Sequence, residues 1–194
     1  PTITCPADIT VSNDAGTCGA VVTYAAPVGV DQCAIASVTQ TDTSGLTAGD
    51  VFPLGTTVQE YTVTDTSGNS STCSFTVTVL DTEPPVLSCV PSIIQPSDAG
   101  ICGAVITFAD PTAIDNCTLD TIFQISGLVS GSTFPVGTTF NQFVAIDSFG
   151  NADTCTFFVS ITYDTVAITN LSASGDFCEG NSDTLFVETS GAQP

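Results

Sequence analysis

The feature that most constrains this chain is an internal repeat. The stretch at 52–79, FPLGTTVQEYTVTDTSGNSSTCSFTVTV, returns without a gap at 134–161 as FPVGTTFNQFVAIDSFGNADTCTFFVSI. A stretch that recurs at a fixed offset is a structural module, so both copies must be built in the same way. The sequence therefore predicts two domains, 1–81 and 82–164, followed by a partial segment, 165–194.

The second half of the repeated stretch predicts a β-strand. Its apolar residues Phe75, Val77 and Val79 stand at odd positions, and Ser or Thr fills the even positions between them. A period of two places the apolar side chains on one face of a strand. The preceding residues at 65–69, DTSGN, favour a tight hairpin turn because Asp and Asn bond their own backbone and Gly accepts a positive φ.

The strand that enters this turn has an irregular pattern. Its apolar residues are Val58 and then Tyr61 and Val63, so the alternation shifts by one near 59–60, and a similar shift falls near 141–142. We interpret the shift as a β-bulge.

The chain as a whole is predicted to be all-β. Thr, Ser, Val, Gly and Pro dominate, and no apolar stripe of helical period is present. Further strands are expected at 2–11, 18–24 and 35–41, and the second of them places Cys18 on the core face. Short antiparallel strands at this spacing indicate immunoglobulin-like β-sandwiches in tandem, stapled by disulfides.

The charge is entirely of one sign. The chain has 20 Asp and Glu residues and no Lys, Arg or His, for a net charge of -20. Such a surface repels phosphate and anionic headgroups, which excludes nucleic acid and anionic membranes as partners. Repulsion among the carboxylates is also expected to raise their average pKa, so that mild acid raises the melting temperature.

The nine cysteines favour a disulfide framework. Four of them recur from one repeat to the next, and zinc is the poorer alternative because there is no C-x-x-C pair and no His. From strand parity we predict these pairs, with Cys178 left unpaired in this fragment: Cys18–Cys73, Cys5–Cys33, Cys102–Cys155 and Cys89–Cys117. Disulfides require an oxidising compartment, so we expect an extracellular, secreted protein, of which this chain without Met or signal peptide is a processed or excised piece.

Several motifs carry a family resemblance. The first copy reads I-x-C-P-x-x-I-x-V, G-x-C-G-A-x-V-x-Y, D-x-C, F-P-x-G-T-T and D-x-x-G-N-x-x-x-C-x-F-x-V, and most of this pattern returns in the second copy. In these motifs the chain resembles the hyalin repeat family. The resemblance implies an extracellular immunoglobulin-like module that occurs in tandem in adhesive and matrix proteins and has no catalytic activity.

Two further segments lie outside this resemblance. Asp81 and Glu83 precede paired prolines and offer hard oxygen ligands for a calcium ion, although six or more ligands are needed and only two are visible. The segment 165–194 is similar to the opening of immunoglobulin-like repeats in surface proteins of Bacteroidota. About thirty residues cannot bury a core alone, so we expect strands from a later part of the chain or from a neighbouring copy to complete it, which would join copies end to end into a fibre.

Catalysis is not expected. Without His or Lys the chain has no base beside a serine or cysteine and no phosphate-binding lysine, which leaves paired carboxylates as the one chemistry that its composition allows. We predict no enzyme activity and no cofactor, with calcium as the sole candidate ion.

Two sequence patterns suggest glycosylation. Many Asp residues precede Ser or Thr, similar to the O-glycosylation signature of Bacteroidota, and the N-x-[ST] sequon also occurs. The candidates are Thr121, Thr165, Thr184, Asn69, Asn116 and Asn170.

Two functions fit these observations. The first is a structural and adhesive repeat of an extracellular fibre. The alternative is a stalk module of an adhesin that binds a glycan or a cell-surface protein through the loops 44–50 and 126–133. Neither loop contains Trp, Tyr or Arg, the residues that anchor most binding hot spots, which favours the structural function.

Overall fold

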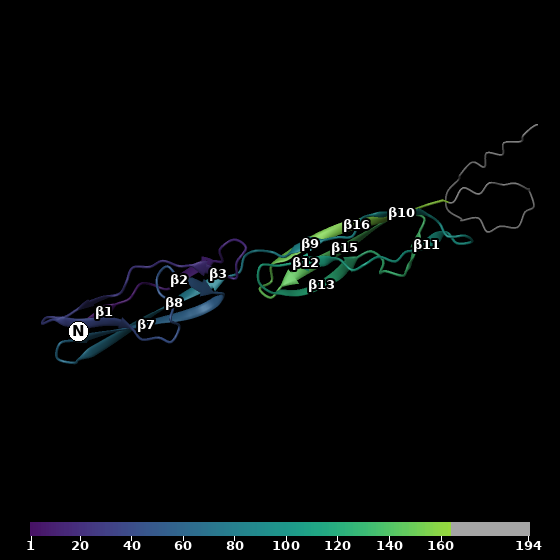
Figure 1. Cartoon of the computed structure of the whole chain (residues 1–194). Coiled ribbons are helices and arrows are strands. Elements are labelled where there is room, and N and C mark those ends of the chain that lie inside the picture. Colours follow the sequence, from purple (N-terminus) through teal and green to yellow (C-terminus); the bar gives the residue numbers. More distant parts are fainter. Residues whose placement is uncertain (164–194) are drawn as a thin grey trace, which may run out of the picture. The chain divides into compact units, whose positions relative to one another are not determined.

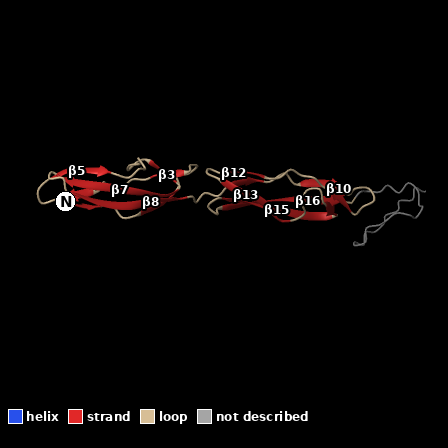
Figure 2. Cartoon of the chain, turned by 90° about the horizontal axis from the view of Figure 1, so that it is seen from below, coloured by secondary structure: helices blue, strands red, loops and turns tan. Residues whose placement is uncertain are grey.

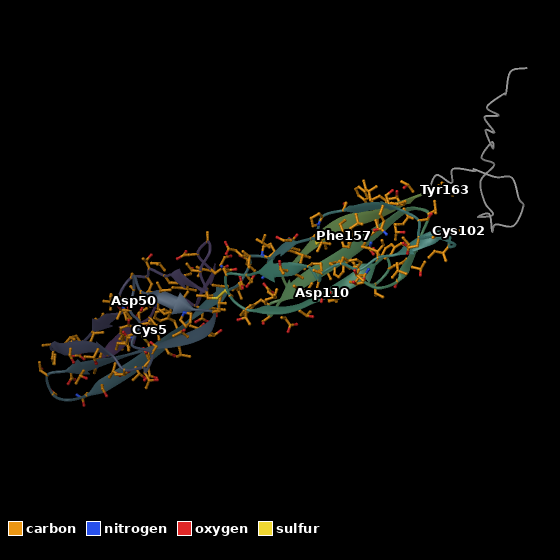
Figure 3. The ribbon with its side chains drawn as sticks, turned by 45° about the vertical axis from the view of Figure 1, so that its right-hand side comes forward. Cys5, Asp50, Cys102, Asp110, Phe157 and Tyr163 are labelled. Atoms are coloured by element: carbon orange, nitrogen blue, oxygen red, sulfur yellow. A yellow bond between two sulfur atoms is a disulfide. The ribbon has the colours of Figure 1, made fainter. Side chains whose placement is uncertain are left out.

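The computed structural model describes residues 1–163, and within this range every regular element is a β-strand (Figure 2). The all-β prediction is thereby confirmed. In the same range no helix has the length and apolar character needed to cross a membrane. Tyr163, the last described residue, follows the final strand directly (Figure 3).

Each repeat contributes the same succession of strands, most of which are labelled in Figure 1. Those of the first repeat are β1 (Thr2–Thr4), β2 (Ile9–Ser12), β3 (Gly19–Val21), β4 (Val28–Val30), β5 (Ile35–Gln40), β6 (Val51–Pro53), β7 (Gly55–Asp65) and β8 (Ser70–Leu80). Those of the second are β9 (Val86–Ser88), β10 (Ile93–Pro96), β11 (Gly103–Val105), β12 (Thr112–Ile114), β13 (Leu119–Ser126), β14 (Thr133–Pro135), β15 (Gly137–Asp147) and β16 (Ala152–Thr162).

The sheet topology is also repeated. In the first repeat a four-stranded sheet has the order β2-β8-β7-β5, and the pairs β1-β4 and β3-β6 form two smaller sheets. The second repeat has the order β10-β16-β15-β13, with the pairs β12-β9 and β11-β14. All pairings with a known register are antiparallel except β2 with β8 and β10 with β16, which are parallel.

The single strand predicted at 2–11 is therefore two strands. β1 pairs with β4, whereas β2 pairs with the end of β8, so the chain changes sheets between Thr4 and Ile9. Pro6 lies in this interval, and because proline has no backbone N–H it cannot continue a ladder of hydrogen bonds. The alternation of apolar residues is unbroken here, which is why it did not reveal the change of sheet.

The core of the first repeat lies between its large and small sheets. Phe75, Val77 and Val79 of β8 are buried together with Phe52 of β6, as the alternation in this strand predicts. Tyr24 closes this cluster edge-on, with its ring centroid 5.0 Å from that of Phe75. Aromatic pairs in this geometry add to the stability gained from burial alone.

The β-bulge predicted near 59–60 is wrong. β7 and β8 pair without interruption from Gly55 opposite Val79 to Thr64 opposite Ser70. The alternation shifts because a polar residue occupies a core position: Gln59 is 0% exposed, whereas its neighbour Val58 is 54% exposed. The structure has a register shift elsewhere, between β5 and β7 at 35–37.

Gln59 remains buried because its amide is fully used. Its Oε1 accepts hydrogen bonds from Tyr24 Oη (3.0 Å) and Gln40 Nε2 (3.1 Å), and its Nε2 donates to Ser44 Oγ (3.0 Å). A buried polar group that is satisfied in this way costs little, whereas the same group without partners would be strongly destabilising. Gln59 thus ties Ser44 and its loop to the core.

The hairpin turn between β7 and β8 forms as predicted. Asp65 Oδ1 accepts the backbone N–H groups of Ser67 (2.8 Å) and Asn69 (2.9 Å), and Gly68 adopts a φ of 88°. Asp147 forms the same bonds to Phe149 and Asn151 in the second repeat. Asp and Gly at these positions therefore specify the turn locally.

The described chain divides into two compact units. One unit contains 1–89 together with 111–125 and 143–155, so it includes residues of both sequence repeats. The other contains 90–110, 126–142 and the described residues from 156 onward.

Candidate functional site

Each repeat is closed by one internal disulfide. Cys5 bonds to Cys73 with a Cα–Cα distance of 5.8 Å, and Cys89 bonds to Cys155 with a Cα–Cα distance of 5.6 Å. Cys5 follows β1 and Cys73 lies in β8, so the bond joins the first strand of the repeat to its last (Figure 3 labels Cys5).

A third disulfide joins the two sequence repeats. Cys18 bonds to Cys117, 99 positions further along the chain. The predicted pairings of Cys18 with Cys73 and of Cys89 with Cys117 are therefore wrong. Cys102 is disulfide-bonded as well, but its predicted partner Cys155 is taken by Cys89.

The error in pairing has a physical cause. Parity within the strand predicted at 18–24 placed Cys18 on the core face, but β3 begins only at Gly19. Cys18 is exposed at the end of the preceding turn, where strand parity has no meaning. The turn residues before it were the signal that should have placed this cysteine at the surface.

Cys33 is the free cysteine of the described range, and it is exposed. Its predicted partner Cys5 is bonded to Cys73, so the Cys5–Cys33 prediction is wrong too. Cys33 follows a short turn in which Asp31 Oδ1 accepts its N–H at 2.8 Å, and Asp31 Oδ2 lies 2.9 Å from the N-terminal ammonium of Pro1. Cys178 lies outside the described residues.

The acidic candidates between the repeats have separate roles. Glu83 accepts the backbone N–H of Gly16 with both carboxylate oxygens, at 3.1 and 2.9 Å, and so holds the turn before Cys18. Asp81 is instead close to Asp115: a carboxylate oxygen of each and Sγ of Cys117 all lie within 4.8 Å of one another. The structure thus pairs Asp81 with a different acidic residue from the one proposed from sequence.

Many other carboxylates bond to their own turns. Hydrogen bonds from Asn69, with its side-chain amide first, hold the pKa of Asp65 below its ordinary value, and the backbone N–H of Thr47 has the same effect on the pKa of Asp50. The pKa is also lowered for Asp8, Asp31, Asp42 and Asp147. For these groups local hydrogen bonding outweighs the general repulsion from which a raised average pKa was expected.

The described glycosylation candidates differ in accessibility. Thr121 is exposed on β13. Asn69 is exposed, but its Nδ2 donates to Asp65 Oδ2 at 2.8 Å, and Asn116 is half-buried with its Nδ2 3.1 Å from the carbonyl oxygen of Thr17. The candidates Thr165, Asn170 and Thr184 lie outside the described residues.

The loop proposed for ligand binding, 44–50, flanks a shallow depression lined by polar residues, among them Asp42, Ser44 and Glu60. Asp42 accepts the N–H groups of Ser44 (2.8 Å) and Glu60 (3.0 Å), and Asp50 accepts the N–H of Thr47 (2.7 Å). These carboxylates stabilise the loop itself, which leaves them less available for a ligand.

The molecule thus combines two sets of β-sheets, each closed by a disulfide, with a further disulfide between sequence repeats. These features define a disulfide-stapled, immunoglobulin-like module in tandem. The HYR domain model matches residues 1–79 and again 80–161, and the chain belongs to the HYR domain family. The resemblance to hyalin repeats in its sequence motifs is confirmed.

Two hyalins and a rat protein are similar to this chain in sequence. Hyalin from Strongylocentrotus purpuratus is 36% identical over 172 residues, and hyalin from Lytechinus variegatus is 37% identical over 134 residues. These alignments cover 86% and 63% of this chain, but the chain spans only 14% and 25% of the two relatives. A rat protein, "Sushi, von Willebrand factor type A, EGF and pentraxin domain-containing protein 1", is 29% identical over 91% of this chain and 5% of its own length.

Among solved structures, protocadherin gamma C5 domains EC1-3 match 80% of this chain and 65% of that chain, with 17% identity and a TM-score of 0.35. Protocadherin gamma B7 domains EC3-6 match 84% of this chain and 50% of that chain, with 15% identity and a TM-score of 0.33.

Proposed function

We propose that this chain is a structural segment of an extracellular adhesive fibre or surface stalk. Membership of the HYR family and the similarity to hyalins support the broader role, an extracellular adhesion module. The disulfides support the location, because structural disulfides persist in oxidising surroundings.

The observation that carries the proposal is the disulfide between Cys18 and Cys117. A module that acts alone needs only its internal bond, here Cys5–Cys73 or Cys89–Cys155. A covalent bond between successive repeats has a different use, because it keeps neighbouring repeats joined even if the linker at 81–85 is cut. Such a bond suits a segment whose task is to transmit force or maintain spacing.

The carboxylates also favour a structural role over ligand recognition. Asp42, Asp50 and Asp65 accept backbone N–H groups of their own loops. Loops whose polar groups are hydrogen-bonded to one another offer few unsatisfied donors or acceptors to a partner. No His, Lys or Arg is present anywhere in the chain to support catalysis or to bind a glycan acid.

Electron microscopy tests the fibre proposal. The full chain, secreted and oxidised, is expected to form continuous filaments, whereas a variant without 166–194 is expected to remain folded and monomeric, as judged by sedimentation. Filaments of the truncated variant would move the joint to the described repeats. Monomers of the full chain at all concentrations, with isolated stalks and a distinct tip on native cells, would contradict the proposal and favour the adhesin.

A further inference from the structure

Two aspartates that lie close together each have a buried carboxylate oxygen without a hydrogen-bond partner. Asp81 is only 6% exposed, and its Oδ1 accepts the N–H of Glu83 at 3.2 Å. Asp115 Oδ1 accepts the N–H of Cys117 at 2.8 Å. In both residues Oδ2 is buried and accepts no hydrogen bond. Because each Oδ1 is fixed by the backbone, the two Oδ2 atoms are the ones left for another group.

This arrangement is unfavourable without a positive charge. A carboxylate oxygen of Asp81 and one of Asp115 lie within 4.8 Å of each other, and like charges at this distance repel strongly away from water. The sequence has no Lys, Arg or His that could neutralise them. The N-terminal ammonium of Pro1 is bound to Asp31.

The equivalent aspartate of the first repeat has a different neighbour. Asp31 and Asp115 occupy equivalent places in the motif D-x-C, and each uses Oδ1 to accept the N–H of the following cysteine. Asp31 Oδ2 bonds to a cation, the Pro1 ammonium at 2.9 Å. Asp115 Oδ2 has no hydrogen-bond partner and the residue lies beside a second carboxylate, so a cation in its neighbourhood has to come from solution.

We propose that Asp81 and Asp115 bind a calcium ion through their Oδ2 atoms. Hard carboxylate oxygens suit Ca²⁺, which accepts six to eight ligands in flexible geometry and completes its shell with water and backbone carbonyls. Mg²⁺ is less suitable because it demands strict octahedral geometry and retains its water. Zn²⁺ is disfavoured because the nearby Sγ of Cys117 is bonded to Cys18 and supplies no thiolate.

Calcium titration of the oxidised full chain tests this site. After removal of metal with EDTA, isothermal titration with CaCl₂ in a buffer of about 0.15 M ionic strength, where diffuse attraction to the net negative charge is screened, should give one stoichiometric event. Calcium should also raise the melting temperature. Asp115→Asn and Asp81→Asn should each weaken this event at least about tenfold, since each removes a charged ligand. MgCl₂ should bind at least about tenfold more weakly than CaCl₂.

The matched control is Asp120→Asn, which makes the same change in net charge at an exposed position on β13. It should leave calcium affinity within about twofold of the original chain. Asn keeps Oδ1, so circular dichroism should show intact folds for all three variants. Equal calcium heats in all four proteins, or no stoichiometric event in the original chain, would overturn the proposal.

Discussion

The motif D-x-C at 31–33 returns at the equivalent place 115–117, and it has opposite surroundings in the two repeats. In the first repeat Asp31 bonds to an ammonium and Cys33 is a free, exposed thiol. In the second, Asp115 lies against Asp81 and Cys117 is bonded to Cys18. The local turn is the same, because both aspartates accept the N–H of the cysteine at 2.8 Å.

The difference shows which properties of a repeat are its own and which come from its neighbour. The turn is encoded by three residues and therefore recurs. Asp81, which lies beside Asp115, and Cys18, which bonds to Cys117, are residues of the first repeat, and the local sequence at 115–117 does not determine them. A tandem array can thus use one motif as a plain turn in one copy and as an attachment point in the next.

Removal of the disulfide at Cys117 should have the largest effect on the free energy of unfolding, and it would make the second motif resemble the first. Cys18→Ser combined with Cys117→Ser opens a loop of 99 positions and should cost about 4 kcal/mol through the added entropy of the unfolded chain. Cys33→Ser, at the equivalent place in the first repeat, should change stability by less than about 0.5 kcal/mol. Thermal and urea unfolding of the three chains measures both.

The disulfide pattern itself can be checked by cleavage before Asp. Digestion of the denatured, unreduced chain should leave the product 14–30 covalently attached to the product 115–119, because these contain Cys18 and Cys117. Reduction should separate them. Recovery of 115–119 as a free product without reductant would contradict the Cys18–Cys117 bond.

Replacement of the buried amide of Gln59 should have the next largest effect on the free energy of unfolding. Gln59→Leu removes the Oε1 acceptor of Tyr24 Oη and the partner of Ser44 Oγ, whereas Gln40 Nε2 keeps Asp42 Oδ2 and the carbonyl oxygen of Leu46; the change should cost about 2 kcal/mol. Val58→Thr changes the outward neighbour and should remain within about 0.5 kcal/mol. The second repeat carries Asn141 at the equivalent buried position, where Oδ1 accepts the N–H of Leu128 at 2.8 Å. Equal urea midpoints for the two variants would refute a core role for Gln59.

A smaller effect is expected where the repeats differ by one hydroxyl group. Tyr24 packs on Phe75 at 5.0 Å as Phe108 packs on Phe157 at 5.0 Å, but Tyr24 Oη also lies 3.2 Å from Tyr61 Oη. Tyr24→Phe makes the first repeat resemble the second and should cost about 1 kcal/mol, the net value of a typical hydrogen bond. Tyr163→Phe, at an exposed position, is the control for loss of a hydroxyl. A stabilised Tyr24→Phe chain would argue against this bond.

The smallest differences between the repeats are expected in their response to acid. The turn carboxylates Asp65 and Asp147 both have a lowered pKa in the folded chain. A group with a lowered folded pKa stabilises the fold above its unfolded value, 3.8, and this contribution is lost as pH falls through the folded value. Melting temperatures should therefore fall below about pH 4, and Asp65→Asn should flatten that decline. A melting temperature that stays constant from pH 5 to 2 would contradict this.

Local sequence was sufficient for part of this structure. The alternation in 70–80 identified β8, and Asp65 with Gly68 identified its turn, because the residues concerned are neighbours in the chain. Two other features depend on partners far along the sequence. Gln59 faces inward because Tyr24, Gln40 and Ser44 satisfy its amide. A pattern based on hydrophobicity cannot predict a buried polar residue of this kind. Cys18 finds Cys117 only once the repeats are folded, so strand parity within one repeat gave the wrong pairs.

The bond between Cys5 and Cys73 also determines how far the chain can be stretched. A pull on the two ends reaches Cys5 after a few residues and passes through sulfur directly to Cys73, so the 68 positions between them carry no tension. At about 3.4 Å per residue this withholds roughly 230 Å of extended chain. With the same bypass from Cys89 to Cys155, the segment from Cys73 to Cys89 is the part between the two disulfides that is left to lengthen. Each repeat would behave as a nearly inextensible link whose limit is the strength of covalent bonds.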